Sequence, residues 1–185
     1  MSGVDIRLAN AGDIPMLAVL ERAAGETFRE IGMPEIADDD PLPEDVLAAG
    51  VADGRLWVAA DAEASPVGYL LALRLGDVAH IEQVTVHPAC ARRGIGAHLI
   101  AACVAWTAEW DATSLTLTTF RDVPWNAPYY KRLGFRIVPG GEVPEPVRRI
   151  VEEERHAGLH RWPRVVMEYR EDRAALGIVT DTGSR

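Results

Sequence analysis

The chain has few cysteines and no long apolar run. Its 185 residues include only two cysteines, Cys90 and Cys103, with neither CxxC spacing nor clustered partners. This pattern argues against a disulfide scaffold or a metal site and fits a reducing compartment. No stretch approaches the roughly 18 consecutive apolar residues of a membrane-spanning helix, and the first ten residues lack the apolar core of a secretion signal. We therefore expect a cytoplasmic protein that is not embedded in a membrane.

Basic residues are also scarce. The chain carries 19 lysines and arginines against 28 acidic residues, a formal net charge of -9. Nucleic acids and anionic membranes are bound by distributed Lys and Arg, so this balance disfavours both partners. A length of 185 residues with 48% hydrophobic content suits one globular domain. We expect that domain to span residues 1–172 and to be followed by a mobile tail, 173–185.

Strand-like and helix-like patterns alternate along the chain. Period-two alternation or short apolar runs predict strands at 4–10, 55–61, 66–75, 78–88, 114–120, 135–138 and 164–169. Apolar spacings of three and four, together with capping residues, predict helices at 14–31, 46–49, 95–109, within 124–134 and at 145–158. The strand–turn–helix–strand order around residue 95 implies one parallel strand pair. These patterns predict a mixed α/β fold.

The strand at 78–88 carries an unusual number of polar residues. Regular alternation predicts that His80, Glu82, Val84 and Val86 share one face and that Ile81, Gln83, Thr85 and His87 share the other. His80 and Glu82 would then lie side by side.

A basic, glycine-containing turn follows this strand, with the sequence ARRGIGAHLI from Ala91 to Ile100. A helix start presents free backbone N–H groups to an anion, and Gly94 and Gly96 let the backbone approach it closely. A turn with two solvated arginines is the alternative. The third glycine of a dinucleotide fingerprint is replaced by Leu99, and the Gly-Lys-Ser/Thr triplet of a Walker loop is missing.

Two motifs together resemble one family. The strand ending VTVHP with its RRGIG turn, and the later segment YYKRLGF from Tyr129 to Phe135, are similar to the acetyl-CoA site and the Tyr-x-x-x-Gly-Phe segment of GNAT N-acetyltransferases. The element order resembles that of the family from about Asp5 to Tyr169. The resemblance implies a central, mostly antiparallel sheet, with a parallel pair that splays apart at the acetyl-CoA site, and flanking helices.

The resemblance also implies which residues bind acetyl-CoA as co-substrate. These residues are Val84, Val86, Arg92, Arg93, Gly94, Ile95, Gly96 and Ala97, with Asn126 as a further candidate that would otherwise only cap a helix. Two positions depart from the family pattern. Ala91 stands where Gln or Arg is usual, and Val123 stands where many members have Asn.

In this family an amine attacks the thioester directly. An alkylamine with a pKa of about 10.4 arrives protonated, so a base is needed. The resemblance implies Glu82 as the first candidate and His80 as the second, with the amide of Val84 as oxyanion donor and Tyr130 as donor to the leaving sulfur. The alternatives are a structural carboxylate paired with arginine for Glu82, and packing for His80 and Tyr130.

The acceptor is a primary amine of a small molecule or peptide in this interpretation. Residues 35–45 hold six acids and no base, a composition that attracts a cationic amine or simply solvates a loop. The resemblance also implies homodimer formation. A non-catalytic module that binds acyl-CoA for regulation is the alternative function, and Ala91 is the feature that favours it.

Overall fold

The computed structural model describes residues 3–170, which divide into two compact units at Leu115/Thr116. The expected tail, 173–185, lies outside the described residues. The first unit contains β1 Asp5–Leu8, α1 Ile14–Arg29, α2 Pro34–Ala37, α3 Glu44–Ala52, β2 Leu56–Ala60, β3 Pro66–Leu75, β4 Val78–Val86 and α4 Ile95–Ala108. The second contains most of β5 Ser114–Phe120, and then α5 Ala127–Arg132, β6 Phe135–Ile137, α6 Glu145–His156 and β7 Arg164–Tyr169.

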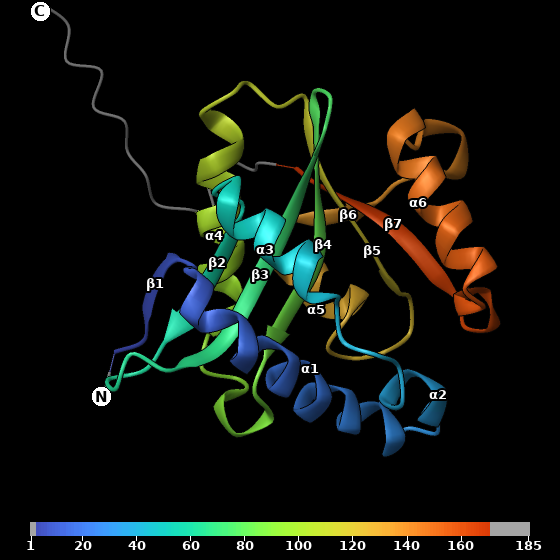
Figure 1. Cartoon of the computed structure of the whole chain (residues 1–185). Coiled ribbons are helices and arrows are strands. Elements are labelled where there is room, and N and C mark those ends of the chain that lie inside the picture. The colour runs from blue at the N-terminus through green and yellow to red at the C-terminus, as the bar shows by residue number, and fades with distance from the viewer. Residues whose placement is uncertain (1–2, 171–185) are drawn as a thin grey trace, which may run out of the picture. The chain divides into compact units, whose positions relative to one another are not determined.

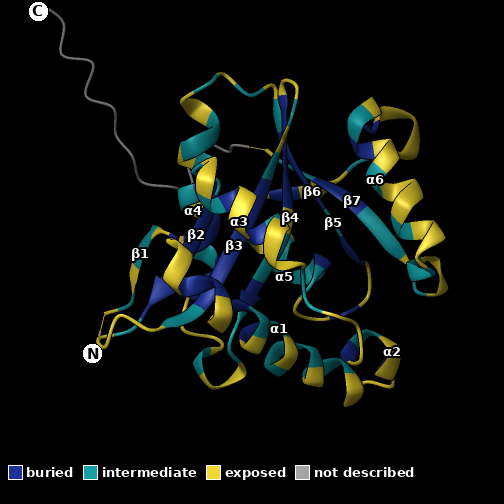
Figure 2. Ribbon diagram, viewed as in Figure 1, coloured by how far each residue is buried: buried dark blue, intermediate teal, exposed yellow. Residues whose placement is uncertain are grey.

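The first unit is built on antiparallel strands paired in the order β1-β2-β3-β4. Its strands β2 to β4 are the most deeply buried segments, shown in dark blue in Figure 2. Leu17 and Leu20 of α1 and Leu47 of α3 pack with Tyr69 and Leu71 of β3 in one apolar cluster. One face of the strands is therefore covered by α1 and α3, which lie in front of them in Figure 1.

The opposite face of the same strands is covered by α4. Leu70 of β3 pairs with Trp57 of β2, and the Trp57 ring meets Trp106 of α4 edge to face at 5.8 Å. The predicted apolar stripe of α4 is confirmed, since Leu99 and Cys103 are fully buried. The helix α4 thus packs on the same sheet to which β4 belongs, and this packing fixes both ends of the turn that joins them.

In the second unit the strands pair antiparallel in the order β5-β7-β6. The helix α6 is tied to β7 by Glu154, which receives two hydrogen bonds from the guanidinium of Arg164 and one from the hydroxyl of Thr118. Phe135 and Met167 are fully buried. The predicted mixed α/β fold, with mostly antiparallel pairing and flanking helices, is confirmed.

The helix α2 was not predicted, because its four residues lie in a segment rich in Pro and Asp that was expected to be a loop. Within residues 3–170, none of the helices combines the length and the apolar character needed to cross a bilayer.

Candidate active site

The turn between β4 and α4 has an unusual backbone. Arg92 has a φ of 60° and Gly94 a φ of 80°, so both lie in the left-handed region that residues other than glycine rarely adopt. A Cβ at Gly94 would have no heavy atom nearer than His98 Cε1 at 3.9 Å. The backbone conformation, rather than crowding, is therefore what requires glycine here.

The same turn concentrates positive potential at its surface. Arg92 and Arg93 are exposed, and the first turn of α4 contains no acidic residue. The first backbone N–H groups of α4, a helix of 14 residues, have no acceptor within the helix. The helix dipole adds partial positive charge at the same end. This arrangement suits a phosphate or pyrophosphate. The side chain of Ala91 carries no polar group, so the polar groups of the turn are its two guanidinium groups and its backbone.

A bulge interrupts β4 at Glu82. Leu71 of β3 pairs with Gln83, but the next residue, Ala72, pairs with Ile81, so Glu82 is an extra residue on its strand. The predicted regular alternation is therefore wrong at this point. His80 pairs with Leu73 and lies on the face of Gln83 and Thr85 rather than on that of Val84.

The two candidate bases differ in exposure. His80 is 1% exposed, whereas Glu82 is classed as exposed. A bulge commonly re-aims a side chain next to an active site, and here it separates Glu82 from the buried row of the strand. Glu82 is therefore the candidate that a substrate reaches without rearrangement of the core.

A partly buried hydrogen-bond network on the α1 side is not apparent from the sequence patterns. The hydroxyl of Tyr69 donates to Oε1 of Glu21 over 2.5 Å, and the backbone N–H of Leu42 donates to both oxygens of Glu21, at 3.2 and 3.3 Å. Burial raises the pKa of Tyr69, and the charges of Glu21 and Glu82 raise it further. Burial also raises the pKa of Glu21.

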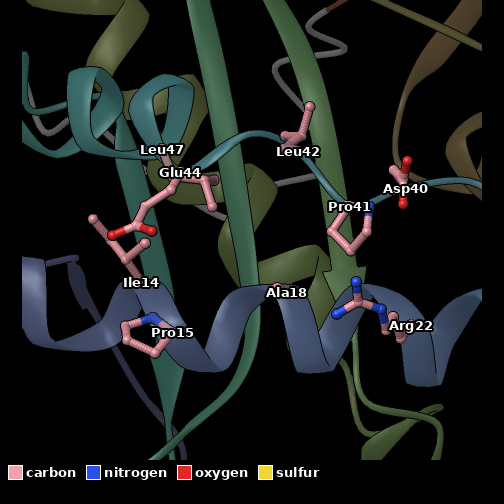
Figure 3. Close-up of a pocket in the computed structure, with 9 residues that line it drawn as sticks. All are labelled: Ile14, Pro15, Ala18, Arg22, Asp40, Pro41, Leu42, Glu44 and Leu47. Atoms are coloured by element: carbon pink, nitrogen blue, oxygen red, sulfur yellow. The ribbon is translucent and has the colours of Figure 1, made fainter.

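The acidic segment 35–45 is joined to α1 by an ion pair and by backbone hydrogen bonds. Asp38 pairs with Arg29 over 2.5 Å, and Leu42 is bound to Glu21 as described. The segment forms one wall of an open pocket of about 340 Å³, and α1 forms the other (Figure 3). The lining residues are Ile14, Pro15, Ala18, Arg22, Asp40, Pro41, Leu42, Glu44 and Leu47.

Tyr130 lies on α5 in the second unit. Its ring is half-buried and makes edge-to-face contacts with Tyr129 at 5.6 Å and with Phe135 at 5.8 Å. Burial raises the pKa of Tyr130, and the neighbouring Tyr129 adds to the shift. The phenol therefore remains protonated throughout the neutral range and can act as a hydrogen-bond donor.

Asn126 occupies the N-cap position of α5 without capping it through its side chain. Its Nδ2 instead donates to Oγ1 of Thr119 over 2.8 Å. Its Oδ1 is buried and accepts no hydrogen bond within the part of the chain that the structure describes. The interpretation of Asn126 as a mere cap is therefore wrong, and an acceptor oxygen is left for another group.

The predicted site residues thus fall into two sets. Val84, Val86, the two candidate bases and the turn from Arg92 to Ala97 belong to the first unit, on β4 and the start of α4. Tyr130 and Asn126 belong to the second, on α5 and immediately before it.

Solved structures with the same fold include several acetyltransferases. N-acetylglutamate synthase of Neisseria gonorrhoeae, complexed with coenzyme A and N-acetyl-glutamate, matches with a TM-score of 0.68 at 20% identity, over 92% of this chain but only 35% of its own. The PaiA N-acetyltransferase of Thermoplasma acidophilum, in complex with coenzyme A, gives 0.62 at 14% identity, over 91% and 99%. The ribosomal-protein-S18-alanine N-acetyltransferase of Escherichia coli gives 0.60 at 15% identity, over 90% and 92%.

At these identities the likeness establishes a common fold. The coenzyme A bound in two of the three structures agrees with acetyl-CoA as the predicted co-substrate. The family model described as acetyltransferase (GNAT) family matches residues 17–135, which include β4, the basic turn, α4 and Tyr130. The match covers more than half of the chain and confirms the resemblance found in the two motifs. The protein belongs to the GNAT family of acetyltransferases.

Proposed function

We propose that this protein transfers the acetyl group of acetyl-CoA to the primary amine of a small molecule or peptide, by direct attack in a ternary complex. The observation that carries the proposal is the turn after β4, where Arg92 and Gly94 both adopt left-handed backbone angles at the start of α4. These residues, with Arg93, Ile95, Gly96 and Ala97, would bind the pyrophosphate of the co-substrate through backbone N–H groups and two guanidinium groups.

The acceptor amine must lose a proton before its nitrogen lone pair attacks the thioester carbonyl carbon. Glu82 is the proposed base, acting directly or through a water, and its exposed position beside the β4 bulge supports this role. His80 remains the second candidate, because its burial makes it less accessible to a substrate than Glu82. The amide of Val84 is the proposed donor to the developing oxyanion, and Val86 lies further along the same strand toward the turn.

As the C–S bond breaks, the departing thiolate gains a hydrogen bond from Tyr130 in this proposal. A thiol has a pKa of about 8.5 and a phenol of about 10, and burial raises the pKa of Tyr130 above its usual value. Complete transfer of the phenolic proton to sulfur is therefore uphill. Tyr130 would stabilise the thiolate mainly as a positioned donor, while the proton that finally reaches sulfur comes from solvent.

Thermal unfolding with acetyl-CoA tests the first part of this proposal, with CoA, ATP and NADH as comparisons. Selective binding raises the melting temperature by mass action. A shift with the two CoA compounds alone would support the co-substrate assignment, and thiol release with a panel of amines would then test turnover. No shift at saturating acetyl-CoA would contradict the proposal.

The non-catalytic acyl-CoA-binding module stays the second candidate, because Ala91 removes one side-chain contact from the turn. It predicts the same thermal shift without thiol release for any amine. The cytoplasmic location and the homodimer stay predictions.

A further inference from the structure

The Glu21–Tyr69 pair places a half-buried carboxylate against a fully buried tyrosine. Tyr69 is 0% exposed at the centre of β3, and its hydroxyl is held by a carboxylate on α1, 48 positions away in sequence. Removing a carboxylate even partly from water costs free energy before its hydrogen bonds are counted, and an apolar pair of similar shape often stabilises a protein as well or better. Stability alone therefore gives this pair little justification.

One end of the pair reaches β4 next to the proposed base. Thr85 lies directly opposite Tyr69 in the pairing of β4 with β3, and Gln83 Nε2 donates to Oγ1 of Thr85 over 2.8 Å. Gln83 is the residue directly after Glu82, where the pairing with β3 changes register. Two hydrogen bonds and one cross-strand pair therefore connect Glu21 with the edge of the bulge.

The other end of the pair reaches the acidic segment. Glu21 accepts the backbone N–H of Leu42 with both of its oxygens, and Leu42 follows directly on Asp40 and Pro41 in the wall of the pocket. The charge of Asp39 also acts on Glu21. The same carboxylate thus fixes the segment and, through Tyr69, the strand that carries Glu82.

We propose that Glu21 and Tyr69 are positioning residues for the acceptor amine. They hold the segment 39–42 and the bulged part of β4 in one arrangement, so that a cationic amine attracted by the segment meets Glu82 in a defined orientation. This inference rests on the proposed acetyl transfer to an amine. Neither residue touches the reacting atoms, and neither lies in the turn that binds the co-substrate, so the acceptor KM should change while the KM for acetyl-CoA does not.

The variants Tyr69→Phe, Glu21→Leu and the double variant separate positioning from stability. Each single change removes one partner of the Tyr69–Glu21 hydrogen bond and should lower the melting temperature. The double variant removes both partners and should be more stable than Glu21→Leu, although the N–H of Leu42 still lacks its acceptor. We expect all three to raise the acceptor KM about tenfold, with acetyl-CoA KM within about twofold of the unaltered protein.

Asp13→Asn is the matched control. Asp13 is also a buried carboxylate, bound by Arg7 at 2.8 and 2.9 Å, but it lies eight residues from Glu21, about 12 Å along the helix direction. Its loss should lower the melting temperature without changing the acceptor KM.

The decisive comparison is the double variant. A melting temperature above that of Glu21→Leu with a persistently raised acceptor KM supports positioning, whereas wild-type kinetics in the double variant would overturn it. Unchanged acceptor KM in both single variants would overturn it as well. Failure of the underlying function gives a different result, because the unaltered protein would then release no thiol with any amine of the panel.

Discussion

The side-chain amide of Asn126 donates a hydrogen bond to Oγ1 of Thr119 over 2.8 Å, and this bond fixes the direction in which the amide points. The Oδ1 atom is consequently buried without a donor from the described residues. A buried polar atom left in this state costs about 1–3 kcal/mol. A donor from a bound molecule, such as an amide N–H of the pantetheine arm, would remove that cost.

The variant Asn126→Ala should therefore bind CoA more weakly, with a Kd raised roughly tenfold. Thr119→Val is the companion variant, because it releases the Asn126 amide without removing it. Its Kd for CoA should lie between those of the unaltered protein and Asn126→Ala. Calorimetric titration with CoA measures both effects. An Asn126→Ala protein with unaltered affinity would show that Oδ1 does not meet the ligand.

The left-handed angle of Gly94 gives a second prediction. Alanine at this position would be strained by about 1–2 kcal/mol, and the strain would distort the backbone N–H groups of the turn. We expect Gly94→Ala to lower both the melting temperature and the affinity for acetyl-CoA.

Gly76 offers a matched control for this prediction. It has a φ of 69° in the turn between β3 and β4, and a Cβ there would meet no heavy atom within 4 Å. Gly76→Ala should lose similar stability and retain full affinity for acetyl-CoA. Equal loss of affinity in the two variants would mean that general destabilisation, rather than the geometry of the turn, controls binding.

Much of the fold could be predicted from local patterns. The predicted strands at 66–75, 114–120 and 164–169 agree with β3, β5 and β7 in both bounds, because each is a β-prone run between turn residues. The helix predicted at 95–109 differs from α4 by one residue. The glycine at which this helix begins and the apolar spacing along it are local features, so they can be recognised in a single sequence.

The bulge and the buried pair could not be predicted in the same way. In residues 80–86 the one local irregularity is the adjacent polar pair Glu82 and Gln83, and no Gly or Pro marks the position; the register change itself exists only in the pairing with β3. Glu21 lies four residues after Leu17 and three before Ala24, so helical spacing places it on the apolar side of α1, but its partner is 48 positions away. In both cases the partner lies in a distant segment, so local periodicity marks a polar residue out of pattern without showing what it pairs with.

The roles proposed for the two polar residues of β4 lead to a third prediction. Glu82→Gln should lower kcat/KM for the amine roughly a hundredfold or more, and raising the pH should restore part of the activity as free amine accumulates. His80→Asn changes a residue buried to 1% exposure, so it should lower the melting temperature more than it lowers the rate. The opposite ranking of the two rates would assign the base to His80.

Tyr130 gives a fourth prediction. Because burial raises its pKa, the phenol stays protonated across the pH range in which an amine becomes deprotonated, and the rate should not fall through Tyr130 below about pH 10. Tyr130→Phe should lower kcat about tenfold to a hundredfold with little change in the KM for acetyl-CoA. Full turnover by Tyr130→Phe would remove Tyr130 from the reaction.

The two cysteines give a final prediction that needs no substrate. Cys90 is half-buried in the turn before α4, and Cys103 is fully buried within it. Burial raises the pKa of Cys103 to about 12. Since the thiolate is the reactive form, a disulfide reagent at pH 8 should modify Cys90 quickly and Cys103 only after denaturation.

The same shift sets the sign of a pH effect on stability. The folded protein retains the Cys103 proton above about pH 8.5, where the unfolded thiol begins to lose it. The contribution of Cys103 to the free energy of unfolding is therefore fully present below about pH 8.5 and is lost as the pH rises toward 12. Denaturant unfolding between pH 8 and 10.5 should show the decrease, and Cys103→Ala should show a shallower one. Two rapidly modified thiols in the native protein at pH 8 would contradict the burial of Cys103.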